Sequence, residues 1–210
     1  MIGTWKIDVT VGAMPEAVAT AFAKTNAQLL GAEYTPIAYL GSQIVNGTNH
    51  AVLAEQTVLT GKDTKNVVLM IFNQKPEQVG DATLVNIERV LESGGRDGGI
   101  DIDVKTEIPE EAMNVFNTAF EGFCGSKVEP FALLGTQVTT GINDIFAAEV
   151  TSVTEVPVKS VALVTVNGLT NSVSFADILT SKLDIMNLGT AYTWLRNQNP
   201  SVAKPIDQWA

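Results

Sequence analysis

Residues Tyr39–Gln56 read Y-L-G-S-Q-I-V-N-G-T-N-H-A-V-L-A-E-Q, two runs rich in apolar residues that are joined at Asn46-Gly47. An Asn-Gly pair between such runs is the strongest short-range signal for a β-hairpin, because both residue types tolerate a positive φ. The stretch therefore predicts two antiparallel strands, over residues 37–44 and 51–59, with a short connection between them.

The same pattern occurs again later in the chain, where Leu134–Glu149 reads L-G-T-Q-V-T-T-G-I-N-D-I-F-A-A-E. Gln137 follows Gln43 by 94 residues, and this spacing holds without a gap across most of both halves. A repeat of this length indicates one structural unit used twice. The matched pairs are Pro15 and Pro109, Phe22 and Phe116, Gly31 and Gly125, Pro36 and Pro130, Gly41 and Gly135, Gly47 and Gly141, Asn49 and Asn143, Glu55 and Glu149, and Asn73 and Asn167.

A glycine-rich stretch separates the two copies. Ser93–Gly99 reads S-G-G-R-D-G-G, and four glycines in seven residues are typical of a flexible linker. Each copy is long enough to bury a core of its own. The expected division is a first domain at 1–92, a linker at 93–99, a second domain at 100–182 and a C-terminal tail at 183–210.

The tail lies outside the repeat. It contains Trp194 and Trp209, two side chains that are costly to leave in water. We expect it to pack either on the protein's own second domain or on a partner.

A strand and a helix are predicted ahead of each hairpin. Trp5–Val11 alternates apolar and polar residues, which is typical of a half-buried strand. Pro15 suits the first turn of a helix, and Val18, Phe22 and Leu29 then recur at helical spacing. In the second copy the expected helix face is Phe116, Ala119, Phe120 and Phe123. Two further strands, at residues 67–72 and 83–91, complete the first copy.

Composition excludes several classes of partner. The chain has 210 residues, 45% of them hydrophobic and 17% charged, with a formal net charge of −10. Phosphate-backbone binding uses clustered Lys and Arg, and the sequence has no such cluster, so nucleic acid is not expected. No apolar run is long enough to cross a bilayer, and the first residues do not resemble a signal peptide. These observations are compatible with the cytoplasm or a virus particle.

Residue types that carry chemistry are scarce. His50 is the only histidine and Cys124 the only cysteine, so the common zinc ligand sets are not available. We expect His50 on the solvent face of a strand and Cys124 as a small buried residue. Asp101 and Asp103 alternate with isoleucines, as the wet face of a strand does. We therefore expect no catalytic residues, no metal, no cofactor and no enzymatic activity.

The first copy resembles a known family. Gln43-Ile44-Val45-Asn46-Gly47 has the form Q-x-V-x-G of the cystatins, and the sequence continues as in stefin-type cystatins. The strand at Met70–Phe72 and the later Pro76 also look stefin-like. The resemblance covers residues 1–92, whereas Gln137–Gly141 departs by having Thr139 at the third position. It implies an α+β fold: two tandem cystatin-like domains, each a strand, a long helix and a four-stranded antiparallel meander wrapped on the helix.

The resemblance implies a non-enzymatic inhibitor of papain-like cysteine proteases. In that family, an N-terminal segment containing a glycine and two hairpin loops form a wedge that fills the protease cleft. A hairpin pinned by its own strands loses little entropy on binding. The contact residues carried over are Gly3 in the N-terminal segment, Gln43, Ile44, Val45, Asn46 and Gly47 in the first loop, and Pro76 in the second.

Two alternatives stay open beside this one. A Gly-containing hairpin is also what such a fold needs to turn the chain, so Gln43–Gly47 can be purely structural. The duplication, the low charge fraction and the strands rich in Thr, Val and Asn also suit a structural or assembly protein, such as a virion component. Its partners would be copies of itself or other assembly subunits.

Overall fold

The computed structural model describes residues 3–59, 64–77, 81–94 and 98–181. The predicted tail at 183–210 and part of the predicted linker lie outside the described residues. The first half contains β1 (Trp5–Val11), α1 (Glu16–Gln28), β2 (Ala32–Val45), β3 (Gly47–Val58), β4 (Thr64–Gln74) and β5 (Thr83–Glu92). The second half contains β6 (Ile100–Lys105), α2 (Glu110–Ala119), β7 (Ser126–Thr139), β8 (Gly141–Ser152), β9 (Lys159–Asn167) and β10 (Val173–Thr180).

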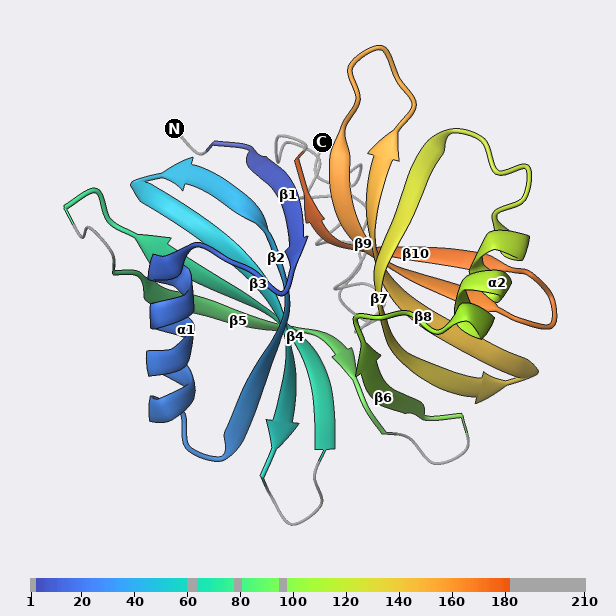
Figure 1. Ribbon diagram of the computed structural model, residues 1–210, viewed down its shortest axis with the longest axis horizontal. Helices are drawn as coiled ribbons and strands as arrows, with labels where there is room; N and C mark the ends of the chain where they lie inside the picture. The colour runs from blue at the N-terminus through green and yellow to red at the C-terminus, as the bar shows by residue number, and fades with distance from the viewer. Residues whose placement is uncertain (1–2, 60–63, 78–80, 95–97, 182–210) are drawn as a thin grey trace, which may run out of the picture.

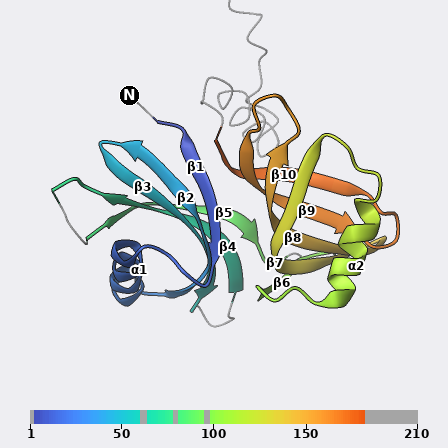
Figure 2. The same cartoon turned by 45° about the horizontal axis from the view of Figure 1, so that its top comes forward.

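The strands form two five-stranded antiparallel sheets with the same topology. The first has the order β1-β2-β3-β4-β5, and the second has the order β10-β9-β8-β7-β6. In each half the helix connects the first strand to the second (Figure 1). The two sheets lie against each other in the middle of the molecule, and α1 and α2 lie on the outer sides (Figures 1 and 2).

The two halves share one hydrophobic core between the sheets. Leu40, Leu53 and Val67 from the first sheet belong to the same buried cluster as Leu134 and Val161 from the second. Two smaller clusters lie on the outer faces, under the helices. β3 and β4 are buried on both faces. One face packs in the cluster that includes α1, and the other face packs against the second sheet.

The expected fold class is wrong. Over the described residues the structure is mainly antiparallel β-sheet, and the two helices found there are short, with 13 and 10 residues, rather than long helices each wrapped by a cystatin-like meander. The physical reason lies in the strands. Five consecutive buried residues in β3 and eight in β4 give both sheet faces apolar side chains, so each sheet needs a second cover, which the other sheet supplies. In the second half, α2 ends at Ala119, before the predicted Phe120 and Phe123.

The predicted hairpin is present, with longer strands than expected. β2 begins at Ala32 and passes through Pro36, where a register shift between Pro36 and Ala38 accommodates a residue that has no N–H to donate. The connection is short because Val45 already pairs with Gly47, whose φ is +100°. β1 spans the predicted Trp5–Val11.

Candidate functional site: two braced hairpin tips

A ladder of side-chain hydrogen bonds runs from Gly3, which precedes β1, across β2, β3 and β4 near the end of the first hairpin. The Gln43 amide nitrogen donates to the carbonyl oxygen of Gly3 at 2.8 Å. The Asn49 amide nitrogen donates to the Gln43 side-chain oxygen at 3.1 Å, and that of Asn73 donates to Asn49 at 2.8 Å. Because Gln43 and Asn73 are buried, this ladder is a brace that holds the strand ends together.

The second half repeats the ladder bond for bond. Gln137 donates to the carbonyl oxygen of Gly98 at 2.8 Å, Asn143 donates to Gln137 at 3.2 Å, and Asn167 donates to Asn143 at 2.7 Å. The Asn167 oxygen also accepts from the backbone N–H of Leu169 at 3.0 Å, which orders the adjoining loop. The Gln and Asn residues shared by the two copies are therefore structural.

Gly3 and Gly47 allow three segments to meet at one edge: the N-terminal residues, the first hairpin and the end of β4. The Gly3 N–H donates to the Ile44 carbonyl oxygen at 3.1 Å, and a Cβ at Gly3 would lie 2.5 Å from that oxygen. A Cβ at Gly47 would collide with the backbone oxygen of Gln74 and would lie 3.2 Å from the Cα of Lys75. We call this edge the first tip, defined as Gly3, Ile44, Val45, Asn46, Gly47, Lys75 and Pro76.

The predicted contact residues differ in their accessibility. Ile44 is 76% exposed, and Asn46 and Pro76 are also exposed. Gly3, Val45 and Gly47 are half-buried, whereas Gln43 is buried in the ladder. Asn49 and Asn73 were not predicted to have a role, although they recur as Asn143 and Asn167, which was the available signal.

The second hairpin carries a larger apolar end. Val138 lies directly opposite Ile142 in the β7–β8 register, and the two residues are 67% and 54% exposed. Leu169 is 69% exposed, and its Cβ would be only 2.8 Å from a Cβ at Gly141. We call this edge the second tip, defined as Gly98, Val138, Thr139, Thr140, Gly141, Ile142 and Leu169. Figure 1 places the ends of the two hairpins on opposite sides of the molecule.

Equivalent rows beside the two tips carry opposite charges. In the first half, Ser42 lies between Lys6 and His50 in the strand register. In the second half, Thr136 lies in the same way between Asp101 and Asp144. Lys6 and Asp101 are both exposed. The fold therefore presents a lysine at one end where it presents a carboxylate at the other.

His50 and Asp144 occupy equivalent positions, and His50 is buried whereas Asp144 is half-buried. The expectation of a solvent-facing His50 is wrong, because its side chain is buried and its Nδ1 lies 3.0 Å from the Tyr39 hydroxyl. Burial lowers the pKa of His50 and raises the pKa of Asp144, since desolvation disfavours the charged form of each. Cys124, expected to be buried, is exposed.

We predict that these two groups give stability changes of opposite sign with pH. The unfolded state protonates His50 near pH 6.5 and the folded state only at lower pH, so the free energy of unfolding falls as pH drops from 6.5 through the lowered pKa. Each unit of pKa difference corresponds to about 1.4 kcal/mol. Urea unfolding of wild type and His50→Gln between pH 8 and 5 checks this, and equal slopes for the two proteins would contradict it.

Asp144 provides the matched comparison. Because its folded-state pKa is raised, the folded state keeps a proton that the unfolded state releases, and this group's contribution to stability declines as pH rises above 3.8. Asp144→Asn removes this decline, so the variant is expected to be more stable than wild type at pH 7 and similar to it at the lowest pH at which the protein stays folded.

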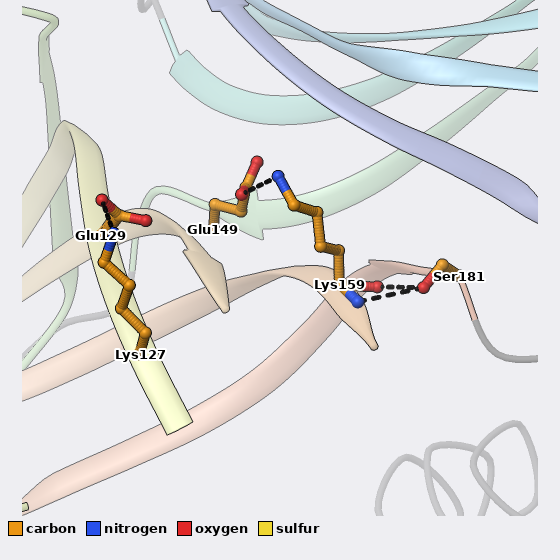
Figure 3. Close-up of polar contacts among 5 residues, drawn as sticks. All are labelled: Lys127, Glu129, Glu149, Lys159 and Ser181. Atoms are coloured by element: carbon orange, nitrogen blue, oxygen red, sulfur yellow. Dashed lines mark hydrogen bonds and ion pairs between the residues drawn. The ribbon is translucent and has the colours of Figure 1, made fainter. Parts of the chain in front are cut away.

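A cross-strand ion pair supports each sheet away from the tips. In the second half, Lys159 reaches the largely buried Glu149 at 2.6 Å, and the hydrogen bond to Glu149 raises the pKa of Lys159 (Figure 3). The backbone N–H of Lys159 donates to the Ser181 hydroxyl at 3.1 Å, and that hydroxyl donates to the carbonyl oxygen of Lys159 (Figure 3). The first half has the equivalent pair, Lys65 and Glu55, at 3.1 Å. These contacts pin β3 to β4 and β8 to β9.

We predict a measurable loss of stability when the ladder is cut at its centre. Asn49→Ala leaves the buried amides of Gln43 and Asn73 without their partner, which is expected to lower the free energy of unfolding by about 1–3 kcal/mol. Chemical denaturation measures the change. Asn46→Ala, at the exposed turn of the same hairpin, is the control and is expected to change stability by less than about 0.5 kcal/mol. Equal effects of the two variants would show that the ladder does not stabilise the tip.

The described residues hold no group of three or more His, Cys, Asp or Glu side chains placed to bind a metal ion. Nor is any helix in this part of the chain long and apolar enough to cross a membrane. Searches against protein-family models and against curated proteins find no match to the chain.

Proposed function

We propose that this protein is a non-enzymatic assembly protein that contacts further copies of itself through its tips. The observation that supports this most directly is the placement of exposed apolar side chains, Ile44 at one end and Val138 with Ile142 and Leu169 at the other. Single exposed apolar residues are common on protein surfaces. Val138, Ile142 and Leu169 instead form a group at the end of a braced hairpin, and such a group is better suited to a protein contact than a single exposed residue is.

Both tips are held in place before any partner binds. The ladders fix the strand ends, and the shared core ties the two sheets together, so the distance between the tips is set by the fold. A preorganised surface loses little conformational entropy on association. This suits a subunit that must place its neighbours at a defined spacing.

The Q-x-V-x-G pattern also favours assembly over a specialised inhibitory loop. Gln43 is buried and serves the ladder, and Gln137 makes the same bond although its copy departs from the pattern at Thr139. What the two copies share therefore serves the fold. What differs between them is the exposed surface of each tip.

The assembly proposal is tested by sedimentation velocity on the full-length protein. The protein concentration runs from roughly 2 to 200 µM, so that self-association with a dissociation constant in the micromolar range is detected. We expect the average mass to rise with concentration. Ile44→Asp and Val138→Lys are each expected to reduce that rise, whereas Val153→Lys, in the exposed connection between β8 and β9, is the matched control and is expected to have no effect. A wild-type protein that stays monomeric at every concentration would overturn the proposal.

A second candidate function is inhibition of a papain-like cysteine protease by the first tip. The contiguity of Gly3, Ile44 and Lys75, with Pro76 next along the chain, favours it, because three segments then form one edge of the kind such an inhibitor inserts. Titration of a papain-type protease tests it. Inhibition at micromolar protein, lost in Ile44→Asp and retained in Val153→Lys, is the expected result, and full protease activity with wild-type protein would remove this candidate.

A further inference from the structure

We propose that copies of this chain associate head to tail, with the first tip of one copy bound to the second tip of the next. The inference rests on the proposed assembly function and adds to it the polarity of the contact. It follows from the charges beside the tips, from their apolar residues and from their placement in the molecule.

The charges beside the two tips are complementary. The first tip has Lys75 within it and Lys6 beside it, and the described carboxylates nearby are Glu77, next to Pro76, and Asp8, two residues beyond Lys6 on β1. Beside the second tip lie Asp101 and Asp144, and the described residues 98–101, 136–144 and 166–172 contain no Lys or Arg. In a chain with a net charge of −10, a locally basic end is the exception. Opposite potentials across an interface favour the correct pairing and oppose the wrong ones.

Pairing of like tips is disfavoured on the same grounds. Two first tips would bring Lys6 and Lys75 of one copy toward those of the other, and two second tips would bring Asp101 toward Asp101. Like charges across an interface oppose association. Pairing of unlike tips places lysines near carboxylates while Ile44 and Pro76 cover Val138, Ile142 and Leu169. The geometry therefore selects a heterologous contact.

A heterologous contact between opposite ends leads to an open chain. Because the two hairpin ends lie on opposite sides of the molecule, one copy can bind a neighbour at each end (Figure 1). Such head-to-tail contacts close into a ring only if the rotation between neighbours allows it, and otherwise they extend. The average mass is then expected to keep rising with concentration instead of stopping at a dimer.

The test uses two full-length variants that each retain one working tip. Ile44→Asp blocks the first tip with a carboxylate, and Val138→Lys blocks the second tip with an ammonium group. Each variant alone is expected to be monomeric by native mass spectrometry. Their equimolar mixture is expected to associate into species that contain both variants, recognised by mass, beginning with a dimer of one copy of each. Val153→Lys mixed with wild type is the control and is expected to assemble as wild type does.

Each alternative outcome has a distinct meaning. Dimers formed by either variant alone, or a mixture that stays monomeric, would overturn head-to-tail pairing even if wild type assembles. A monomeric wild type would instead remove the assembly function itself. A charge-based variant provides a second readout: Lys6→Glu with Lys75→Glu is expected to weaken association about tenfold at low salt and less at high salt. Association unchanged in this double variant would also contradict the proposed pairing.

Discussion

Gly41→Val is expected to lower the free energy of unfolding by more than about 4 kcal/mol, or to prevent folding altogether. Gly41 has a φ of +146°, and a Cβ at this position would collide with the backbone oxygen of Lys6 and lie 3.1 Å from the Cα of Ile7. β1 cannot retreat at low cost, because the Ile7 side chain is buried in the core between the sheets. The variant must therefore give up the pairing of β1 with β2.

Gly12→Ala is the matched control for this prediction. Gly12 has a φ of +76°, so alanine there is strained, but no atom lies within 4 Å of the added Cβ. The expected loss is about 1–2 kcal/mol, from backbone strain alone. Urea unfolding followed by circular dichroism compares the two variants. If Gly41→Val were no worse than Gly12→Ala, the close approach of β1 to β2 would be incorrect.

Leu134→Ala is expected to destabilise the whole protein, not only its second half. Leu134 is fully buried in the core that both sheets share, and removing such a side chain typically lowers the free energy of unfolding by about 2–5 kcal/mol. Because first-half residues such as Leu40 and Leu53 belong to the same cluster, both halves should unfold in one transition at a lower temperature.

Leu30→Ala provides the same chemical change on the surface. Leu30 is 96% exposed, so its truncation is expected to shift stability by less than about 0.5 kcal/mol. Differential scanning calorimetry separates the possibilities. Two resolved transitions in the Leu134→Ala protein, with only one of them shifted, would show that the halves do not depend on a common core.

The local features of the fold were predictable from the sequence. Asn46-Gly47 marks the hairpin, Pro15 precedes α1, and alternation identifies β1. These signals are local, since they depend on φ preferences and on side-chain periodicity within a few residues. The register shift at Pro36 was not predicted, because a proline reads as an interruption although a bulge lets the strand continue.

The arrangement of the sheets was not predictable in the same way. Burial on both faces of β3 and β4 is compatible with a helix, a sheet or a partner as the second cover, and sequence periodicity does not distinguish these. A resemblance carried by five residues around Gln43 favoured long helices wrapped by sheets, and the structure has two stacked sheets with short outer helices.

The candidate site was predictable in part. Ile44 and Pro76 were expected in two neighbouring contact loops; the structure exposes both and places Lys75, which precedes Pro76, against Gly47. Gln43 was assigned to the contact surface because the motif names it, yet its amide is used inside the fold. The second tip was not predicted, because its prediction would depend on residues that differ between the two copies, whereas the repeat was identified from matched residues such as Gln43 and Gln137. The apolar side chains of the second tip are where the copies differ.

The direct test of the head-to-tail account is carbodiimide cross-linking of wild-type protein prepared as an equal mixture of nitrogen-14 and nitrogen-15 copies. This reagent joins an amine to a carboxylate that it contacts, and isotope pairing shows whether a link lies within one copy or between two. The account predicts links between copies that join Lys6 or Lys75 to Asp101 or Asp144. Links between copies that avoid all of these pairs, found in protein that assembles, would contradict it.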